Sequence, residues 1–225
     1  MSFIATGRLS ESPYIECILR GQADKDHTVM CPADGRWNIC IAKINGKADV
    51  LLEGPMAQAV PKTHVEGIDW IVIKLKLGVY IPSVSVKKLF DHAVTLPRAA
   101  GDSFRLNHVI LPFFDFENAD GLVDRLARHD LLTIDPIVTA TLHDRPVELA
   151  SRTIRHRFVN TIGLPPSTIR QIERARQALT LLQTGVSILD VVYQMGYADQ
   201  SHLTRSFRRF MGHTPAQIPA FYYTD

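Results

Sequence analysis

Six polar side chains near the carboxyl terminus have the types and spacing expected of groups that contact DNA. They lie on one short segment and carry amide, hydroxyl, imidazole and guanidinium groups: Gln200, Ser201, His202, Thr204, Arg205 and Arg208. Base edges in the major groove and backbone phosphates offer matching donors and acceptors. Leu203, Phe207 and Phe210 recur at helical spacing between them. The segment therefore predicts a helix with one apolar side and an opposite side that could read bases.

A shorter helix and a turn are predicted just before this segment. The shorter helix has an apolar stripe at Ile188, Val191, Val192 and Met195. Ser187 and Asp190 form a capping pair at its start. Gly196 suits the left-handed position that ends a helix, and Asp199 can cap the helix that follows. Together these signals predict a helix-turn-helix motif; the alternative is a capped surface helix of an ordinary all-α domain.

The same pattern occurs a second time in the chain. A shift of 49 positions places Ile154–Phe158 over Leu203–Phe207, and it also aligns Gly163 with Gly212 and Pro166 with Pro215. Between the copies, residues 167–184 predict a spacer helix that ends at Gly185. Two recognition helices on such a spacer could enter major-groove segments about 34 Å apart from a single polypeptide.

The first copy departs from the second in its turn. Asp135-Pro136 is a good helix start, but Pro146 stands where a glycine-containing turn is expected, and the connection runs three residues longer. If the next helix begins near Ser151, its outward groups are those of Arg152, Arg155 and His156. These three are the candidates for the first groove. They either read bases or contact phosphates only, which positions a protein without specifying sequence.

Positive charge is concentrated on the two copies. The whole chain has a net charge of +2, and residues 1–116 and 117–225 each carry +1. From Ser151 to Arg209, nine Arg and no Lys stand against three acidic residues, a balance of +6. Arginine suits bidentate bonding to guanine or phosphate. On the spacer helix, Arg170, Arg174 and Arg176 are more simply explained as solvated groups or as ion-pair partners of Glu173.

Residues from about Asn118 to Phe221 resemble the DNA-binding domain of AraC/XylS-type transcriptional regulators. The residues that carry the resemblance are Arg174-Ala175, Leu181-Leu182, Gly185, Ser187-Ile188, Asp190-Val191, the run from Gly196 to Leu203, Arg205, Phe207, Gly212 and Thr214-Pro215. The resemblance implies a seven-helix domain with two helix-turn-helix units. It also implies binding to double-stranded DNA and the recruitment or blocking of RNA polymerase.

The amino-terminal part predicts a β-rich domain. Asn45-Gly46 is a strong hairpin signal between Trp37–Ile44 and Lys47–Leu52. Alternation from Ile71 to Leu77 predicts a strand with one buried face. We expect a small barrel or sandwich, and the resemblance implies a sensor or dimerisation domain, often a cupin-like barrel, at this position. Candidate lining residues for an effector pocket are His64, Trp70 and Tyr80.

Several classes of protein are disfavoured by what the sequence lacks. No two histidines are separated by a single residue, and there is no nucleophile elbow, phosphate loop or HExxH motif. The three cysteines lack the paired spacing of a zinc site or disulfide framework, so we expect reduced, buried thiols, with redox sensing as the less favoured alternative. No apolar run is long enough for a membrane span, and no secretory leader is evident. We expect a cytoplasmic protein with no cofactor, no metal and no enzymatic activity.

The predicted fold is α+β with two domains. Residues 1–98 form the β-rich domain, 99–116 a linker that packs against one domain, and 117–225 the all-α DNA-binding domain, with its first helix over Asn118–Leu132. Its helix-turn-helix units cover 135–163 and 187–212. The predicted function is transcriptional regulation, as an activator or a repressor, with a small-molecule effector and a homodimer as further expectations. The alternative is a ligand-binding or enzymatic β-barrel fused to a degenerate helical domain that no longer binds DNA.

Overall fold

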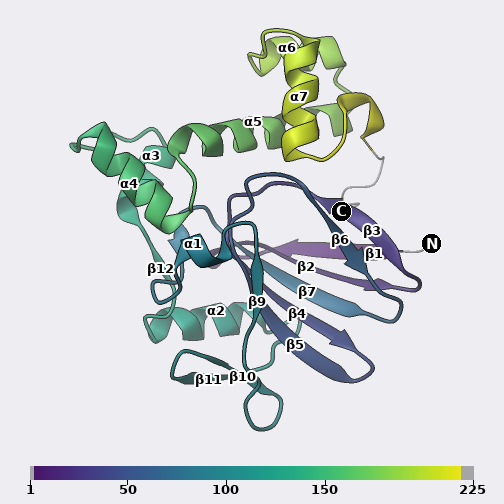
Figure 1. Cartoon of the computed structure of the whole chain (residues 1–225), viewed down its shortest axis with the longest axis vertical. Coiled ribbons are helices and arrows are strands. Elements are labelled where there is room, and N and C mark those ends of the chain that lie inside the picture. Colours follow the sequence, from purple (N-terminus) through teal and green to yellow (C-terminus); the bar gives the residue numbers. More distant parts are fainter. Residues whose placement is uncertain (1–2, 219–225) are drawn as a thin grey trace.

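The computed structural model describes residues 3–218, and a mixed β-rich half is followed by helices (Figure 1). Residues 1–2 and 219–225 lie outside the described residues. They include the predicted outer ends of both domains and Phe221, where the family resemblance ends. The main sheet has the order β1-β2-β7-β4-β5-β9. Its strands are β1 (Phe3–Leu9), β2 (Ile15–Ala23), β4 (Asn38–Ile44), β5 (Lys47–Glu53), β7 (Asp69–Leu75) and β9 (Ala93–Thr95). All of its neighbouring strands are antiparallel.

The two faces of this sheet differ because strand residues alternate sides. One row across the strands, formed by paired residues, is apolar and buried: Ile18, Ile73, Ile39 and Leu52. The adjacent row, on the opposite face, is largely polar: Cys17, Lys74, Asn38 and Glu53. The apolar face forms the first hydrophobic core. The ion pairs of Lys74 with Asp34 and of Glu53 with Lys62 are formed from this polar face.

The predicted hairpin at Asn45-Gly46 is confirmed. β4 and β5 pair from Asn38 with Glu53 to Ile44 with Lys47. Asn45 and Gly46 have φ values of 49° and 75°, which is the left-handed pair that a two-residue type I′ turn requires. The predicted strand near Ile71 is also present, as β7.

Three further two-stranded sheets complete the β-rich half. They are β3 (His27–Cys31) with β6 (Val60–His64), β8 (Val79–Tyr80) with β12 (Thr133–Ile134), and β10 (Ser103–Leu106) with β11 (Val109–Pro112). A short helix, α1 (Val86–Leu89), follows β8 in the chain. Within the described residues, β1 and β9 end the main sheet without pairing to each other, so a closed cupin-like barrel is not confirmed.

The segment 99–116 and the helix after it pack on the first core. β10 and β11 form a hairpin there, and Phe104 and Leu111 are buried. α2 (Ala119–Arg128) buries Leu122, Val123 and Leu126 in the same core. We expected this helix to begin the helical domain. Its apolar stripe packs on the main sheet instead. After α2, the first residue that belongs to the second hydrophobic core is Val138.

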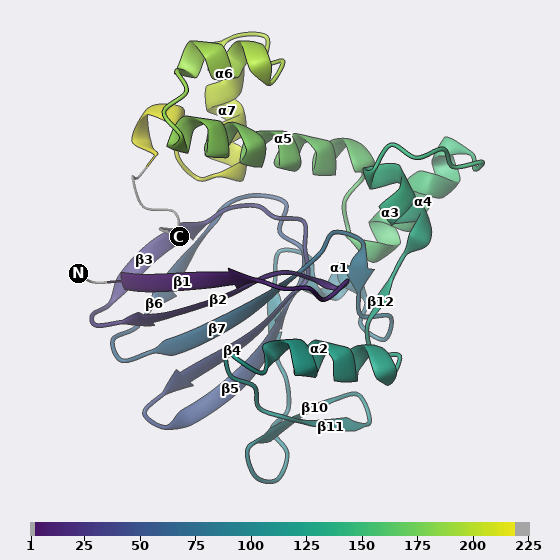
Figure 2. The ribbon, with the colours of Figure 1, turned by 180° about the vertical axis from the view of Figure 1, so that it is seen from behind.

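Five α-helices and a short 3-10 helix form the carboxyl-terminal part up to residue 218. They are α3 (Pro136–Leu142), α4 (Ser151–Thr161), α5 (Pro166–Gln183), α6 (Ile188–Gln194), α7 (Gln200–Phe210) and η1 (Pro215–Gln217). Viewed from opposite sides in Figures 1 and 2, α5 runs between the pair α3–α4 at one end and the pair α6–α7 at the other. No helix among the described residues is long and apolar enough to cross a membrane.

The internal repeat predicted from the sequence is present in the structure. α4 and α7 each span 11 residues, and each boundary of α7 lies 49 positions after that of α4. α3 and α6 each span 7 residues but start 52 positions apart, which accounts for the longer first connection. Both copies bury the same aromatic position, because Phe158 is 1% and Phe207 0% exposed. The glycines after the two helices, Gly163 and Gly212, have φ values of 81° and 78°.

Candidate nucleic-acid interface

The second helix-turn-helix unit forms as the sequence predicts. The Ser187 hydroxyl accepts a hydrogen bond from the Asp190 backbone N–H at 3.1 Å, and the Asp199 carboxylate accepts one from the His202 N–H at 2.6 Å. Gly196 has a φ of 65° in the turn between α6 and α7. Leu203, Phe207 and Phe210 are all buried in the second core. The polar side of α7 therefore faces outward.

The six candidate residues on α7 fall into two groups. Gln200, Ser201, Arg205 and Arg208 are exposed, whereas His202 and Thr204 are half-buried. The His202 ring packs edge-on against Tyr197, with 5.2 Å between ring centroids, and its Nδ1 lies 3.3 Å from the Ala198 backbone N–H. His202 thus supports the turn. The Thr204 hydroxyl donates to the Gln200 carbonyl at 2.8 Å, which leaves its oxygen lone pairs and methyl group available.

The candidates on α4 occupy the equivalent positions of the first unit. In the repeat, Arg152, Arg155 and His156 correspond to Ser201, Thr204 and Arg205. All three α4 side chains are exposed. α4 and α7 thus present equivalent positions toward solvent, with Arg155 exposed where Thr204 is half-buried.

The repeat also identifies two residues that the sequence analysis did not single out. Asn160 and Arg209 are equivalent, and both are exposed. The Asn160 amide lies 3.2 Å from the His156 ring nitrogen Nδ1, and the Arg209 guanidinium lies 4.9 Å from the Phe210 ring centroid. When the two sequence copies are aligned with the 49-residue shift up to the ends of α4 and α7, Asn160 is paired with Arg209. This alignment is the sequence signal that identifies the two residues.

A buried carboxylate holds the first unit together. Asp135 is 3% exposed, and its Oδ1 accepts hydrogen bonds from the N–H groups of Ile137 and Val138 at 2.9 and 3.1 Å. Its Oδ2 lies 3.4 Å from Arg157 and 3.5 Å from the Thr161 hydroxyl on α4. Asp135 therefore caps α3 and ties it to α4.

The nine arginines from Arg152 to Arg209 divide by what they contact. Three of them form ion pairs: Arg157 with Asp135, Arg170 with Asp144, and Arg176 with Glu16. Two lie over an aromatic ring, and the first of these is Arg174 over Tyr197. Arg209 lies over Phe210. Within residues 3–218, the remaining four have neither an ion pair nor a ring contact: Arg152, Arg155, Arg205 and Arg208. Glu173 pairs with Arg36 of the β-rich half rather than with a spacer arginine.

α4 and α7 lie on one side of the molecule. In Figure 1, α7 lies in front of α5 and α4 lies in front of α3. Figure 2, seen from behind, reverses both orders. α5 has 18 residues and is therefore about 27 Å long at 1.5 Å per residue, which is of the same order as one turn of DNA.

The three candidates for an effector pocket do not all come together. His64 on β6 lies between two rings, with centroid distances of 5.2 Å to His27 and 5.5 Å to Trp70. Tyr80 lies on β8, which pairs with β12 in a different sheet. Burial, together with the neighbouring charges of His27 and Lys62, lowers the pKa of His64. His64 and Trp70 thus remain neighbours that could share a ligand, without Tyr80.

The comparisons with known proteins bear on the helical part. The family described as a helix-turn-helix domain matches residues 145–219. These residues are a helix-turn-helix domain of the AraC type. Domains of this type bind DNA in transcriptional regulators, so the match points to a regulator rather than an enzyme.

Two solved structures are similar to the chain. The structure of ToxT from Vibrio cholerae is 13% identical with a TM-score of 0.44, and the comparison covers 96% of this chain and 97% of that one. ToxT from Vibrio cholerae O395, bound to (E)-4-(8-methylnaphthalen-1-yl)but-3-enoic acid, is 12% identical with a TM-score of 0.47 over 96% and 98% of the two chains. A search of curated proteins finds no match.

Proposed function

We propose that the chain is a sequence-specific transcriptional regulator that places α4 and α7 in adjacent major-groove segments of double-stranded DNA. The observation that carries the proposal is the division of the arginines. Those with ion-pair partners hold helices together or join the two halves of the chain. The four that have neither an ion pair nor a ring contact within residues 3–218 all lie on the outward sides of α4 and α7. Exposed guanidinium groups in this arrangement suit phosphates and guanine edges.

Individual residues have different roles in this proposal. Gln200 and Thr204 lie in the amino-terminal half of α7, which is the part of a recognition helix that contacts base edges. The Thr204 hydroxyl hydrogen is engaged with the Gln200 carbonyl, so Thr204 offers an acceptor oxygen and a methyl group. These groups suit an exocyclic amine or the thymine methyl. Arg208 lies one turn further on and suits a phosphate.

The β-rich half regulates this activity in the proposal. It would bind a small-molecule effector or a second copy of the chain, and the promoter-bound protein would contact RNA polymerase. His64 and Trp70 are the proposed ligand contacts, because their rings lie within 5.5 Å of each other. A pair of neighbouring rings, tilted by 41° to each other, suits contact with an apolar or aromatic effector.

A gel-shift series at several salt concentrations tests DNA binding. Four phosphate contacts predict that log affinity falls with log salt with a slope of about −3 to −4. A degenerate helical domain that no longer binds DNA shows neither affinity nor slope, and that result refutes the proposal. Arg125→Ala is the matched control, because Arg125 is an exposed arginine on α2.

Substitutions separate base readers from phosphate contacts. Gln200→Ala and Thr204→Ala are expected to relax sequence preference by about 1–3 kcal/mol at particular bases. Arg208→Ala is expected to weaken binding to all sequences alike and to reduce the salt slope by about 1. If all three variants lose affinity uniformly, the assignment of Gln200 and Thr204 as base readers is wrong.

A further inference from the structure

One segment of the β-rich half contacts the same point on both recognition helices. Residues 33–37 lie in the connection between β3 and β4. The Trp37 indole N–H donates to the Thr161 carbonyl, the last of α4, at 3.0 Å. The Ala33 backbone N–H donates to the Phe210 carbonyl, the last of α7, at 2.7 Å. Thr161 and Phe210 are equivalent residues of the 49-residue repeat, so a single segment caps the two helices at the same place.

These two hydrogen bonds lie in protected surroundings. Trp37 is 1%, Thr161 3% and Phe210 2% exposed. The last backbone carbonyls of a helix accept no hydrogen bond from the helix itself. When they are buried, they need a donor from elsewhere in the protein. Water cannot readily replace the Ala33 and Trp37 donors there. Each recognition helix is therefore held at its carboxyl end by the β-rich half.

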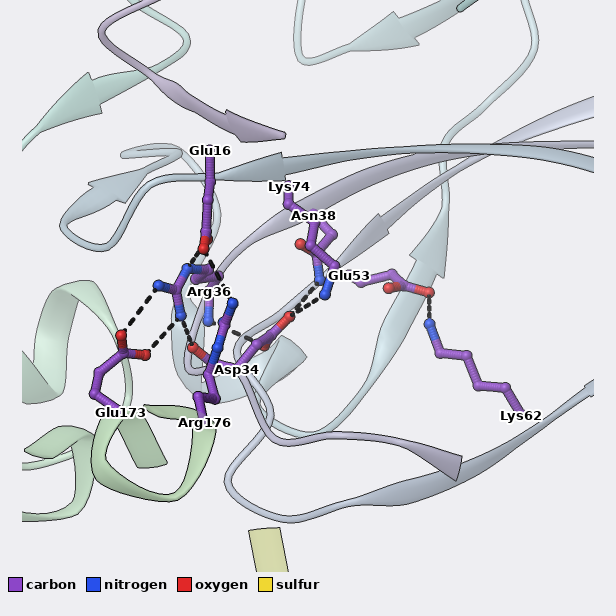
Figure 3. A network of polar contacts seen from close by, with 9 residues as sticks. All are labelled: Glu16, Asp34, Arg36, Asn38, Glu53, Lys62, Lys74, Glu173 and Arg176. Atoms are coloured by element: carbon purple, nitrogen blue, oxygen red, sulfur yellow. Dashed lines mark hydrogen bonds and ion pairs between the residues drawn. The ribbon is translucent and has the colours of Figure 1, made fainter. Parts of the chain in front are cut away.

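The same segment also forms an ion pair with the middle of the spacer helix α5. The Arg36 side chain is 6% exposed and lies between two carboxylates, 2.9 Å from Glu173 on α5 and in contact with Glu16 on β2 (Figure 3). Arg176 of α5 reaches Glu16 at 3.0 Å. Burial opposes the charge of Arg36, but the carboxylates of Glu16 and Glu173 outweigh it and raise the pKa of Arg36. The guanidinium thus keeps its charge and needs both partners in place.

Close packing leaves little room for the segment to slide along α5. A Cβ added at Gly35 would lie 2.7 Å from Ile169 Cδ1 on α5. Ala33 is fully buried as a member of the second core, although it belongs to the β-rich half in sequence. The segment therefore has three supports in the helical part: the end of α4, the middle of α5 and the end of α7.

We propose that residues 33–37 position the two recognition helices and so set the separation between the two DNA segments that the chain accepts. The inference rests on the proposed function and adds a second determinant of spacing to the spacer helix. The spacer helix α5 is joined to α4 by residues 162–165 and to α6 by residues 184–187. If α5 were the only link between the two units, each unit could pivot at these connections. Contacts from one segment to the end of α4, the middle of α5 and the end of α7 remove that freedom. Trp37 and Arg36 are thus positioning residues that need not contact DNA.

Selection from a random duplex library tests this inference. The wild-type chain is expected to enrich duplexes with two conserved blocks at one separation. The variant Arg36→Met combined with Trp37→Phe is expected to enrich the same two blocks spread over two or more separations, with each block unchanged. The matched control is Arg125→Met, which removes an exposed arginine of α2 and is expected to keep the single separation. A single wild-type separation in the folded double variant overturns the inference.

If the double variant fails to fold, Trp37→Phe is used alone in the selection, because it keeps a buried ring and removes only the indole donor.

A distance measurement that needs no DNA tests the same inference. Spin labels at Arg152→Cys and Ser201→Cys occupy equivalent exposed positions of α4 and α7. The label distance distribution is expected to broaden on Trp37→Phe and to stay narrow on Arg125→Met.

Failure of the proposed function has a different signature. In that case the wild-type chain enriches no duplex at any salt concentration, while the label distances still respond to Trp37→Phe. An unchanged label distance in that variant overturns the positioning role itself.

Discussion

Replacing Asp135 by alanine tests how the first helix-turn-helix unit is held together. Its counterpart is Ser187, which caps the equivalent helix of the second unit. The two caps differ in burial. Asp135 is 3% exposed and serves four donors on two helices, whereas Ser187 is exposed and serves the Asp190 N–H. The cost of removing each cap should differ for that reason.

The magnitude follows from the groups that lose their partner. Loss of an N-cap typically costs about 1 kcal/mol in unfolding free energy. Asp135→Ala also leaves the N–H of Val138 and the hydroxyl of Thr161 buried without an acceptor, at about 1–3 kcal/mol for each fully unsatisfied group. The Arg157 side chain is 54% exposed, so its ion pair adds less than about 1 kcal/mol. Because the cap loss already includes the Val138 N–H, the total is about 2–5 kcal/mol for Asp135→Ala. Ser187→Ala should cost about 1 kcal/mol, because water can satisfy the exposed groups.

Urea denaturation followed by circular dichroism measures both changes, provided that the slope of free energy against urea is the same for the compared proteins. Asp135→Asn is the control, since an amide oxygen can still accept the two backbone N–H groups and should restore much of the loss. Equal costs for Asp135→Ala and Ser187→Ala would show that burial does not decide the strength of these caps. The reasoning would then be refuted.

Three further predictions concern the core and the titrating groups. Phe207→Ala should cost about 3–5 kcal/mol, because Phe207 is fully buried, and urea denaturation measures it. The imidazole of His64 should titrate below 6.5 by NMR, because burial lowers its pKa. In the window just below pH 6.5 the unfolded chain then binds the proton more readily, so this group makes the protein less stable as the pH falls; a His64 pKa at or above 6.5 contradicts this. Burial, and then the Glu53 carboxylate, raise the pKa of Cys40 well above its ordinary value, so its thiol should react with a disulfide reagent at pH 8 only when urea unfolds the chain.

The recognition helix of the second unit could be predicted because its signals are local. Ser187, Asp199 and Gly196 each act within four residues of the backbone groups that they serve. The apolar positions of α7 recur at the helical period, and all of them face one core. The exposure of Gln200, Arg205 and Arg208 follows from that periodicity alone. Their role in reading DNA is a prediction that only binding experiments can test.

Long-range packing could not be predicted in the same way. The amphipathic pattern of α2 predicts a helix with one buried face, but it does not say which core that face meets. Trp37 and Arg36 have no spacing that relates them to Thr161 or Glu173, more than one hundred residues later. Likewise, no local pattern keeps Tyr80 apart from His64. These relations depend on how complete elements dock.

The buried charge at the junction argues for one specific docking of the two halves. Apolar side chains already join them, since Leu77 and Phe90 of the β-rich half pack against the second core. Apolar contact alone tolerates small displacements, because the hydrophobic effect is not directional. Arg36 does not tolerate them: a shift of α5 that separates it from Glu173 leaves a buried charge partly unpaired, which is strongly unfavourable. The ion pairs therefore select one position of α5 among those that apolar contact allows, and that position carries both recognition helices with it.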